Sequence, residues 1–239
     1  MRSAQRTGPA GPTDSADDRA LVRDSACVWL ASGIVGLSFG AVAVGGGLPL
    51  WMPVLMSLVV YAGAAQFSAL GVLFAGGGPA AAVAAGLALN TRNAAFSLAV
   101  AEIIGSGRWV SRFLGAHLVT DETVAFALAQ PDPARRRRAF WFVGLGLFAV
   151  WNLGVLAGAL AGGALGDTRR YGLDTAFPAV LTALVLPALR ADPAVRRCAL
   201  LGAGFALAAA PAVPAGVPLL LALAGLFAHR RPAVSGAAV

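Results

Sequence analysis

Charged residues are scarce in this sequence, and lysine is absent altogether. Asp, Glu, Lys and Arg make up only 12% of the 239 residues, whereas soluble domains carry about 25%. Hydrophobic residues make up 58%, and the mean hydropathy is +0.76. This composition excludes an ordinary soluble domain and predicts an all-α, polytopic membrane protein.

Familiar catalytic and metal-binding motifs are also lacking. A P-loop needs a lysine and HExxH needs two closely spaced histidines, and the sequence offers neither. Its two cysteines, Cys27 and Cys198, do not have the spacing of metal ligands, and we expect both to be buried small side chains. We therefore expect no catalytic residue, no metal and no cofactor.

The basic residues are eighteen arginines, and the net charge is +7. Because the arginines are spread over short segments, this charge fits membrane topology better than binding of nucleic acid. Residues 1–26 contain few apolar side chains and are expected to form a disordered cytoplasmic tail. Residues 27–228 are expected to form the transmembrane domain, and residues 229–239 a short C-terminal tail.

Eight apolar stretches are candidates for membrane-spanning helices. They cover residues 27–44, 50–75, 80–104, 110–130, 139–166, 175–189, 198–210 and 215–228. The last two are separated by prolines, and one kinked helix over residues 198–228, which gives seven spans, is the alternative. With eight spans and a cytoplasmic N-terminus, thirteen arginines lie inside and four outside, namely Arg108, Arg112, Arg169 and Arg170. This asymmetry predicts that both termini are cytoplasmic.

Polar residues interrupt the third stretch. Its middle reads Asn90-Thr91-Arg92-Asn93, and an arginine near the centre of a spanning helix costs about 3 kcal/mol on insertion scales. Such a segment needs a polar cavity, or partner groups at the same depth. The helix around Arg92 is either regular or broken near the midplane, as in transporters whose unwound segments bind substrate there.

Further polar residues are expected at a similar depth in neighbouring spans. A rise of about 1.5 Å per residue brings Gln66, Asp121 and Asn152 close to the level of Asn90-Thr91-Arg92-Asn93. In a regular helix His117 and Asp121 share one face. Ionisable groups inside spans usually face a water-filled or substrate-lined cavity, which favours a transport pathway. The alternative is structural: the amides bond helix to helix, and Arg92 pairs with Asp121 or Glu122.

Small residues recur at a four-residue spacing in two stretches. They are Ser32, Gly36 and Gly40 in the first stretch and Gly154, Gly158, Gly162 and Gly166 in the fifth. Such stripes let another helix approach closely. The glycines of the fifth stretch either pack within this chain or receive a partner subunit.

Six short blocks stand in an order and spacing that is typical of one family. They are Ser38-Phe39-Gly40, Gly47-Leu48-Pro49-Leu50-Trp51, Tyr61-Ala62-Gly63-Ala64-Ala65-Gln66-Phe67, Asn90-Thr91-Arg92-Asn93, Thr120-Asp121-Glu122-Thr123 and Gly172-Leu173-Asp174-Thr175-Ala176-Phe177-Pro178. Over about residues 31–188 the sequence resembles the AzlC family of branched-chain amino acid permeases. The resemblance implies export of valine, leucine or isoleucine, with methionine as a further candidate, driven by the proton motive force. It also implies a bacterial inner-membrane location and a small AzlD-type membrane protein as partner.

A mechanism follows from the residues themselves. The substrate is expected to bind at Gln66, Asn90, Arg92, Asn93 and Asn152. Arg92 suits the carboxylate because a guanidinium can make two parallel hydrogen bonds to it. Asp121, or Glu122 as second choice, faces the ammonium or carries the coupled proton. Leu89, Phe67 and Phe96 are candidates for the apolar wall.

Two other function classes remain open at this point. The chain can be a non-transporting assembly or sensor subunit, in which Arg92 and Asp121 form a structural pair. It can also be a membrane-embedded enzyme that acts on a lipid. An enzyme of that kind needs a carboxylate or histidine cluster at the membrane interface, and the expected midplane depth of these groups argues against it.

Overall fold

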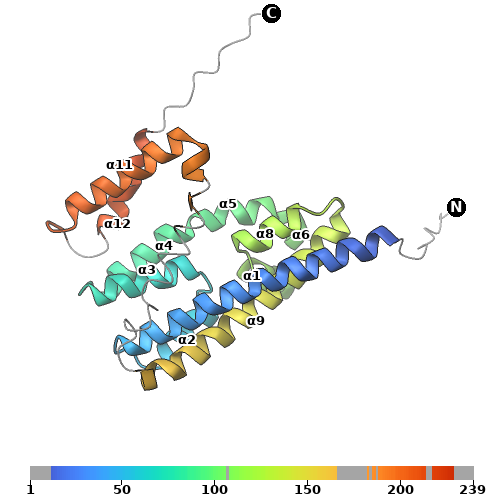
Figure 1. Cartoon of the computed structure of the whole chain (residues 1–239), viewed down its shortest axis with the longest axis horizontal. Coiled ribbons are helices and arrows are strands. Elements are labelled where there is room, and N and C mark those ends of the chain that lie inside the picture. Colours follow the sequence, from blue (N-terminus) through green and yellow to red (C-terminus); the bar gives the residue numbers. More distant parts are fainter. Residues whose placement is uncertain are drawn as a thin grey trace, which may run out of the picture.

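The computed structural model describes residues 12–105, 108–165, 182, 185–186, 188–213 and 217–228. In these ranges every regular element is a helix (Figure 1). The helices are α1 (Pro12–Gly45), α2 (Trp51–Val59), α3 (Gly63–Phe74), α4 (Pro79–Asn90), α5 (Arg92–Ala99), α6 (Ala101–Gly105), α7 (Trp109–His117), α8 (Asp121–Leu128), α9 (Pro133–Leu165), α11 (Pro193–Ala209), α12 (Val217–Leu221) and the 3₁₀ helix η2 (Ala222–Ala228). The prediction of an all-α chain is confirmed for this part of the protein.

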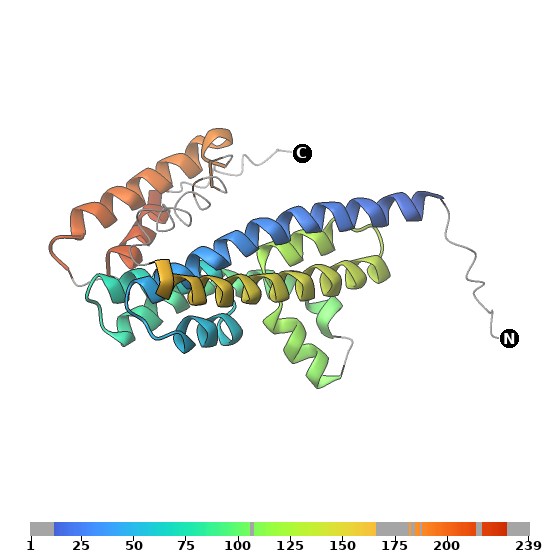
Figure 2. The ribbon, with the colours of Figure 1, turned by 60° about the horizontal axis from the view of Figure 1, so that its bottom comes forward.

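Helices α1 and α9 lie side by side and run in the same direction (Figure 1, Figure 2). Glycines allow their backbones to touch: a Cβ added to Gly36 would lie 2.8 Å from the Trp151 carbonyl oxygen, and one on Gly162 2.6 Å from that of Ala41. The predicted close approach is confirmed. Gly154, Gly158 and Gly162 pack against α1 within this chain, so the alternative of a partner subunit on these three positions is wrong. Gly166 lies outside the described residues.

Within α1, Gly36-Leu37-Ser38-Phe39-Gly40 has the letters of the GxSxG nucleophile motif. That motif works at a sharp turn from a strand into a helix, where the serine is presented to substrate. Here the five residues lie inside an uninterrupted helix, and Ser38 is 1% exposed. The match therefore gives no support to a hydrolase.

The N-terminal part of α1 corrects the prediction of a disordered tail over residues 1–26. The helix begins at Pro12, so residues 12–26 are helical. Asp18 lies near this end, where negative charge is favoured by the helix dipole. An ion pair of 3.0 Å joins Asp18 to Arg138 of α9. The sequence offers few apolar residues here, but charge pairing and continuity with the apolar part of α1 hold the helix.

The stretch predicted as one span over residues 50–75 is two helices that fold back. α2 ends at Val59, α3 begins at Gly63, and Tyr61 between them has a φ of 42°. α3 then returns to the end of the molecule at which α2 began, where the Phe74 ring contacts Gly46. The prediction of a single crossing helix is wrong here because the chain reverses at the break.

Helices α4, α5 and α6 cross the molecule in the direction opposite to α1 and α9. α4 packs against α3, and a Cβ on Gly86 would lie 3.6 Å from the Ala65 carbonyl oxygen. At the far end of this crossing, Arg137 of α9 donates a hydrogen bond of 3.2 Å to the Ile103 carbonyl. The helix is interrupted at the single residue Thr91, so of the two alternatives for the helix around Arg92 the structure favours the interrupted one. With a cytoplasmic N-terminus and alternating spans, the third stretch would run parallel to the first. That predicted direction is wrong, because these helices run opposite to α1.

Helices α7 and α8 form a second folded-back pair, which enters from the opposite end. α7 begins next to Arg108, which lines one cavity together with Arg137. After a break at residues 118–120, α8 returns to Gln130, whose carbonyl accepts a hydrogen bond of 2.9 Å from Arg136. Because the break separates His117 from Asp121, the prediction that they share a helical face is wrong. Arg108 lies at the same end as Arg137, which corrects the predicted placement of Arg108 on the opposite side.

The first five predicted spans therefore become three crossings and two re-entrant pairs in the described part of the chain. Two single helices there are long and apolar enough to span a membrane, Asp18–Gly45 and Pro133–Ala164. The third crossing is assembled from the shorter helices α4, α5 and α6. The count of eight single-helix spans is not reproduced because residues 50–75 and 110–130 return to the end from which they came.

The C-terminal region folds as a helical hairpin. α11 packs along η2, and a Cβ on Gly225 would lie 2.6 Å from the backbone nitrogen of Gly202. Two segments separated by a turn are thus confirmed for residues 198–228, and the single kinked helix is wrong. The predicted span over residues 175–189 and the tail over 229–239 lie largely or wholly outside the described residues.

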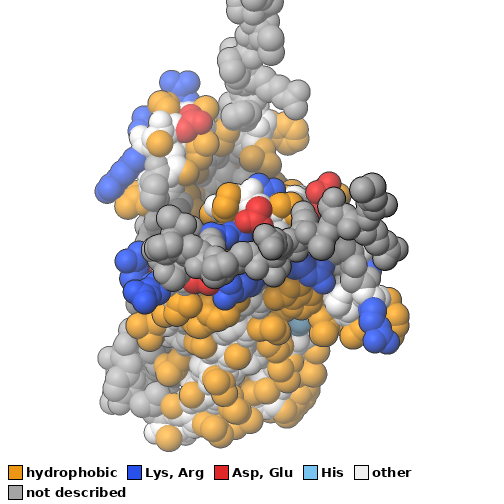
Figure 3. Space-filling view, turned by 90° about the vertical axis from the view of Figure 1, so that its right-hand side faces the viewer, with side chains coloured by type: hydrophobic (Ala, Val, Ile, Leu, Met, Phe, Trp, Pro, Cys, Tyr) orange, Lys and Arg blue, Asp and Glu red, His pale blue; other side chains and the backbone are white. Residues whose placement is uncertain are grey.

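The end of the molecule at which α1 and α9 begin faces the viewer in Figure 3. Arginine and acidic side chains gather in a band across this end, and the surface below the band is almost entirely hydrophobic. Large apolar side chains such as Leu98, Trp109 and Phe113 are 69–78% exposed. An extensive apolar surface beside a charged band is typical of a protein embedded in a bilayer.

Candidate functional site

The breaks of the two re-entrant pairs meet beside α9. His117 Nε2, at the end of α7, lies 2.9 Å from the Leu58 carbonyl oxygen at the end of α2. Because a carbonyl only accepts hydrogen bonds, this contact assigns the histidine proton to Nε2. The Tyr61 ring centroid lies 5.7 Å from that of His117 and 4.9 Å from that of Phe148 on α9. One aromatic cluster therefore joins both breaks to α9. We call this meeting point of Leu58, Tyr61, His117 and Phe148 the junction.

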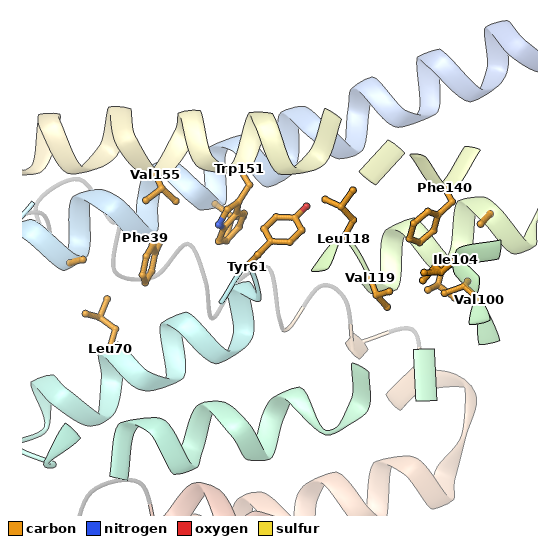
Figure 4. Packing of buried hydrophobic residues seen from close by; sticks show 14 residues of the cluster. Phe39, Tyr61, Leu70, Val100, Ile104, Leu118, Val119, Phe140, Trp151 and Val155 are labelled. Atoms are coloured by element: carbon orange, nitrogen blue, oxygen red, sulfur yellow. The ribbon is translucent and has the colours of Figure 1, made fainter. Parts of the chain in front are cut away.

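Tyr61 holds the most unusual backbone conformation in the described chain. It is the one non-glycine residue there with a positive φ, and its side chain is only 5% exposed. Figure 4 places its ring between Trp151 and Leu118, with the hydroxyl pointing toward Leu118. A bulky residue in this region of φ costs about 1–3 kcal/mol, and such strain is concentrated at functional sites.

Three buried side chains next to this junction carry polar atoms without a hydrogen-bond partner among the described residues. They are the Tyr61 hydroxyl, both ends of the Gln66 amide, and the Trp151 indole nitrogen. Gln66 is 0% exposed. Leaving a buried polar group unpaired costs about 1–3 kcal/mol, so each of these atoms calls for a partner such as water or a ligand.

The N-terminus of α3 adds backbone donors to the same place. Its N-cap residue, Ala62, has no side chain that can accept from the first turn, so the N–H groups of Gly63, Ala64 and Ala65 are uncapped. Gln66 lies one turn into this helix, and side chains of a helix lean toward its N-terminus. A half-buried, uncapped helix start with unpaired donors beside it is suited to a carboxylate.

The N-terminus of α8, across the junction, is capped instead. The Thr120 hydroxyl accepts from the Thr123 backbone N–H at 3.2 Å, and the Thr123 hydroxyl accepts from the Thr120 N–H at 2.8 Å. Two orphan donors are thereby satisfied. The two half-helices are therefore not equivalent, since α8 has a side-chain cap and α3 has none.

We expect replacement of Thr120 by alanine to destabilise the α7–α8 pair by about 1 kcal/mol, because the cap of α8 is lost. The measurement is the midpoint of thermal unfolding of the purified protein in detergent. Thr120→Ser is the matched control, since it keeps the accepting oxygen and should unfold at nearly the wild-type temperature. Equal midpoints for the alanine and serine variants would contradict the cap.

Asn152 is placed beside the junction by α9. Its Oδ1 accepts a hydrogen bond of 2.7 Å from Ser57 of α2, and its Nδ2 donates to the Phe148 carbonyl at 2.8 Å. The side chain thus ties α2 to α9, as the structural alternative for the amides predicts. A role for Asn152 in binding substrate stays a prediction.

The two acidic residues of the predicted site begin α8. Asp121 and Glu122 are both half-buried, and the Glu122 carboxyl interacts with the Thr120 side chain and electrostatically with Tyr61. A titratable carboxyl thus lies within reach of the junction. No group of three or more His, Cys, Asp and Glu side chains in the described part of the chain could hold a metal ion.

The Asn90-Thr91-Arg92-Asn93 segment lies at the level of the junction, but Thr91 and Arg92 are exposed at the surface of the molecule. Gly86 faces Ala65, so Asn90, one turn further on α4, reaches the level of the α2–α3 break. Arg92 is exposed and makes no hydrogen bond or ion pair with any described residue. The structure does not bring Arg92 together with Asp121 or Glu122. Asn90 and Asn93 are half-buried.

Of the candidate apolar wall, Phe67 and Phe96 pack against the main core. Leu89 lies elsewhere: with Ala88 of α4 it lines an apolar cavity of about 450 Å³ against α11 and η2. Cys198, half-buried, lines the same cavity, while Cys27 is exposed; both are free thiols. The expectation that Cys27 is buried is wrong because that face of α1 points outward.

Tyr61, His117 and Trp151 were not among the predicted binding residues. The Tyr61-Ala62-Gly63 sequence carries the only local signal of the break, since the glycine follows a bulky residue inside an apolar run. Hydropathy over residues 50–75 gives no sign that the chain reverses there.

Comparison of the sequence with known proteins gives the family. The sequence model of one family, described as AzlC protein, matches residues 27–165, more than half of the chain. The chain belongs to the AzlC family. The matched region of this AzlC protein contains all three crossings and both re-entrant pairs.

Two relatives of this AzlC protein come from Helicobacter pylori, and both are named "Uncharacterized membrane protein". The protein of strain 26695 is 32% identical over 131 residues, which is 54% of this chain and 57% of the relative. That of strain J99 is 31% identical over 137 residues, or 56% of this chain and 60% of the relative. The match spans less than two thirds of either relative. No solved structure matches the chain. These findings place the chain in the AzlC family, among membrane proteins.

Proposed function

We propose that this AzlC protein is a secondary active transporter that exports branched-chain amino acids across the bacterial inner membrane. Valine, leucine and isoleucine are the principal candidates, methionine is a further one, and the proton motive force is the energy source. The observation that carries the proposal is the junction of two re-entrant helix pairs at buried, unpaired polar atoms of Tyr61, Gln66 and Trp151. Broken helices that meet near the midplane are a common way to build a transport site.

The substrate carboxylate is proposed to bind the uncapped N-terminus of α3. The backbone N–H groups of residues 63–65, the Gln66 amide and the Trp151 indole are the proposed donors to it, because none of them has a partner among the described residues. Glu122, at the start of α8, accepts the substrate ammonium or carries the coupled proton, with Asp121 beside it. The substrate would thus replace the partners that these groups lack.

The two pairs also suggest how access alternates. The α2–α3 pair closes the site toward one end of the molecule, and the α7–α8 pair closes it toward the other. Their tips are joined by a hydrogen bond between His117 and Leu58 and by aromatic contacts. A small movement of either pair would open the site to one side, as in rigid-body gating around a fixed midplane site.

Arg92, Asn90 and Asn93 are proposed to act on the path to this site, because they lie at its level without an internal partner for the arginine. The arginine-rich end, now including Arg108 and Arg112, is proposed to be cytoplasmic. A small AzlD-type subunit is proposed as partner. It would dock away from Gly154, Gly158 and Gly162, which α1 already covers.

The experiment that tests the function is counterflow of radiolabelled amino acids in proteoliposomes, with and without the AzlD-type partner. We expect valine, leucine and isoleucine to exchange. Charged amino acids should not, because the site is apolar apart from the groups that meet the zwitterion. If no amino acid exchanges in either preparation, transport itself is contradicted. Exchange limited to other substrates would contradict the branched-chain assignment alone.

Coupling to protons is tested by Glu122→Gln. We expect the variant to lose valine accumulation driven by an imposed pH gradient by about tenfold or more and to retain valine exchange at equal pH, because only the proton-carrying carboxyl is removed. Glu102→Gln on α6 is the matched control: that carboxylate is exposed and away from the junction, and the variant should behave as wild type. Unchanged gradient-driven accumulation in Glu122→Gln would rule this residue out.

A further inference from the structure

The apolar cavity between α4 and the C-terminal hairpin shares no lining residue with the junction. Its volume is about 450 Å³, which lies in the range of about 300–1,000 Å³ that is common for ligand sites. The described residues that line it are all Ala, Gly, Val, Leu or Cys. Apart from the Cys198 thiol, their side chains carry no polar atom, so the cavity is suited to an apolar ligand.

The cavity is a slot that follows one face of α11. On this helix its lining residues stand at positions 195, 198, 199, 202 and 203, which is the spacing of residues on a single helical face. From the first to the last they extend over about 12 Å, because a helix rises about 1.5 Å per residue. α11 contributes mainly small side chains, whereas the leucines come from α4 and η2. An elongated hollow of this kind suits a linear, flexible chain.

The helices around the slot are held by contacts of their own. Gly225 of η2 packs on the backbone of α11, since a Cβ there would lie 2.6 Å from the Gly202 nitrogen. Asp192 caps the start of α11 by accepting from the Ala194 backbone N–H at 2.7 Å. α12 lies against α4 and thereby joins the hairpin to the rest of the molecule (Figure 1). The hollow is therefore bounded by well-formed helices.

The slot is continuous with the outer apolar surface of the hairpin. Two of its lining residues, Leu223 and Leu226, are themselves 54% and 64% exposed, and Ala199 and Ala203 are exposed as well. In a membrane protein such a surface meets the hydrocarbon of the bilayer. Water is a poor occupant because it needs polar partners, and an empty slot forfeits dispersion contacts along its walls. The surrounding hydrocarbon is thus the occupant that the slot favours.

We propose that the slot binds an acyl chain of a membrane phospholipid. The chain lies along α11 between Leu89 of α4 and the leucines of η2, and so holds the hairpin against the last turn of α4, which ends at Asn90. A helix of a partner protein is too large: two turns with side chains occupy about 900 Å³ or more, against about 450 Å³ in the slot. The proposal depends on the membrane location of the chain and not on its transport activity.

Alanines of α11 give a matched set of variants. Ala203 lines the slot and is exposed, so Ala203→Phe places a ring where the acyl chain lies. Ala208, also exposed and on the same helix, does not line the slot, so Ala208→Phe adds the same ring outside it. Ala199→Leu is a smaller filling of the slot, in case the phenylalanine variant does not fold. The thermal unfolding midpoint in detergent shows which variants are folded.

The experiment places the full-length protein in liposomes that contain phosphatidylcholine with a photoactivatable diazirine in one acyl chain. After illumination, mass spectrometry measures lipid adducts on Cys198, the thiol in the slot, and on α7, whose exposed side chains Trp109 and Phe113 report bulk lipid. We expect Cys198 adducts in wild type and equally in Ala208→Phe. Ala203→Phe should lower them about fivefold or more, because the ring displaces the chain. Ala199→Leu should lower them in part, and adducts on α7 should not change.

Each contrary result overturns the proposal in a different way. Labelling of α7 without any adduct on Cys198 in wild type would mean that protein closes the slot. Equal lowering by Ala203→Phe and Ala208→Phe would mean a general change of the lipid-facing surface and no site. Much stronger labelling of Cys198 by a diazirine fatty acid at the same mole fraction would mean a site for free fatty acid. The readout needs no transport, so failure here leaves the proposed function untouched.

Discussion

Replacement of Gly158 by alanine is expected to destabilise the protein more than any other single-methyl change in the described chain. A Cβ at this position would contact the Leu37 carbonyl oxygen and lie 2.7 Å from the Leu37 carbonyl carbon and 2.9 Å from its Cα. These are backbone atoms of α1, which cannot rotate away as a side chain can. The two long helices would have to separate, at a cost of about 1–3 kcal/mol or more.

The matched control is Gly163→Ala on the same helix. A Cβ there would meet only a Val44 methyl group at 3.9 Å, which is an ordinary contact. This variant should be as stable as wild type, or more stable by up to about 1 kcal/mol because alanine favours the helix. The measurement is the thermal unfolding midpoint of each protein in detergent. Equal midpoints for the two alanine variants would mean that α1 and α9 do not pack through this stripe.

Replacement of Gln66 by leucine is expected to reduce valine counterflow strongly while leaving the fold intact. Gln66 is fully buried with no hydrogen-bond partner for either end of its amide. Leucine has a similar size and removes this unpaired group, so stability should be equal or higher. The substrate, however, loses a hydrogen bond to its charged carboxylate. Such a bond is worth about 1.5–3 kcal/mol, which corresponds to roughly a 10- to 150-fold loss of counterflow.

Gln130→Leu is the control for this prediction. Gln130 lies just after α8, and its side chain donates to the Phe126 carbonyl at 3.4 Å, away from the junction. We expect wild-type counterflow for this variant. Wild-type counterflow and affinity in Gln66→Leu would place the substrate elsewhere. A marked loss of stability in Gln66→Leu would mean that the amide has a structural partner in the membrane-embedded protein.

Local patterns predicted the features of this fold that depend on neighbours along one helix. The four-residue spacing of Gly36 and Gly40 in α1 and of Gly154 and Gly158 in α9 predicted close helix contact, and each of these glycines packs against the backbone of the other helix. The polar Asn90–Asn93 run predicted an interruption, and the helix is interrupted at Thr91. The prolines after Ala210 predicted a turn, and two helices flank it.

The reversals of the chain were not predictable in the same way. Residues 50–75 are apolar from end to end, so hydropathy describes them equally well as one crossing or as two half-crossings. The reversal depends on the backbone of Tyr61, which is held by ring contacts with His117 and Phe148, residues distant in the sequence. The same holds for the break after His117, where the Thr120 cap begins a new helix.

The residues of the candidate site also fall into those that local sequence predicted and those that only the packing revealed. Gln66 and the carboxyls of Asp121 and Glu122 were predicted from their cost in an apolar environment, which is a property of the residues alone. Tyr61 and Trp151 become candidates only because packing buries their polar atoms without partners. Arg92, the residue with the highest cost in lipid, lies on the outside of this arrangement and does not meet the predicted carboxylates.

The sequence by itself determined that this AzlC protein is a helical membrane protein with polar groups near the middle of its apolar stretches. Composition and periodicity suffice for that, because they decide which segments leave water. Only the tertiary structure decided which stretches cross and which return, and hence that two breaks meet at one junction. The direction of a chain after a break is set by one backbone angle and by contacts between residues far apart, and neither is written in local hydropathy.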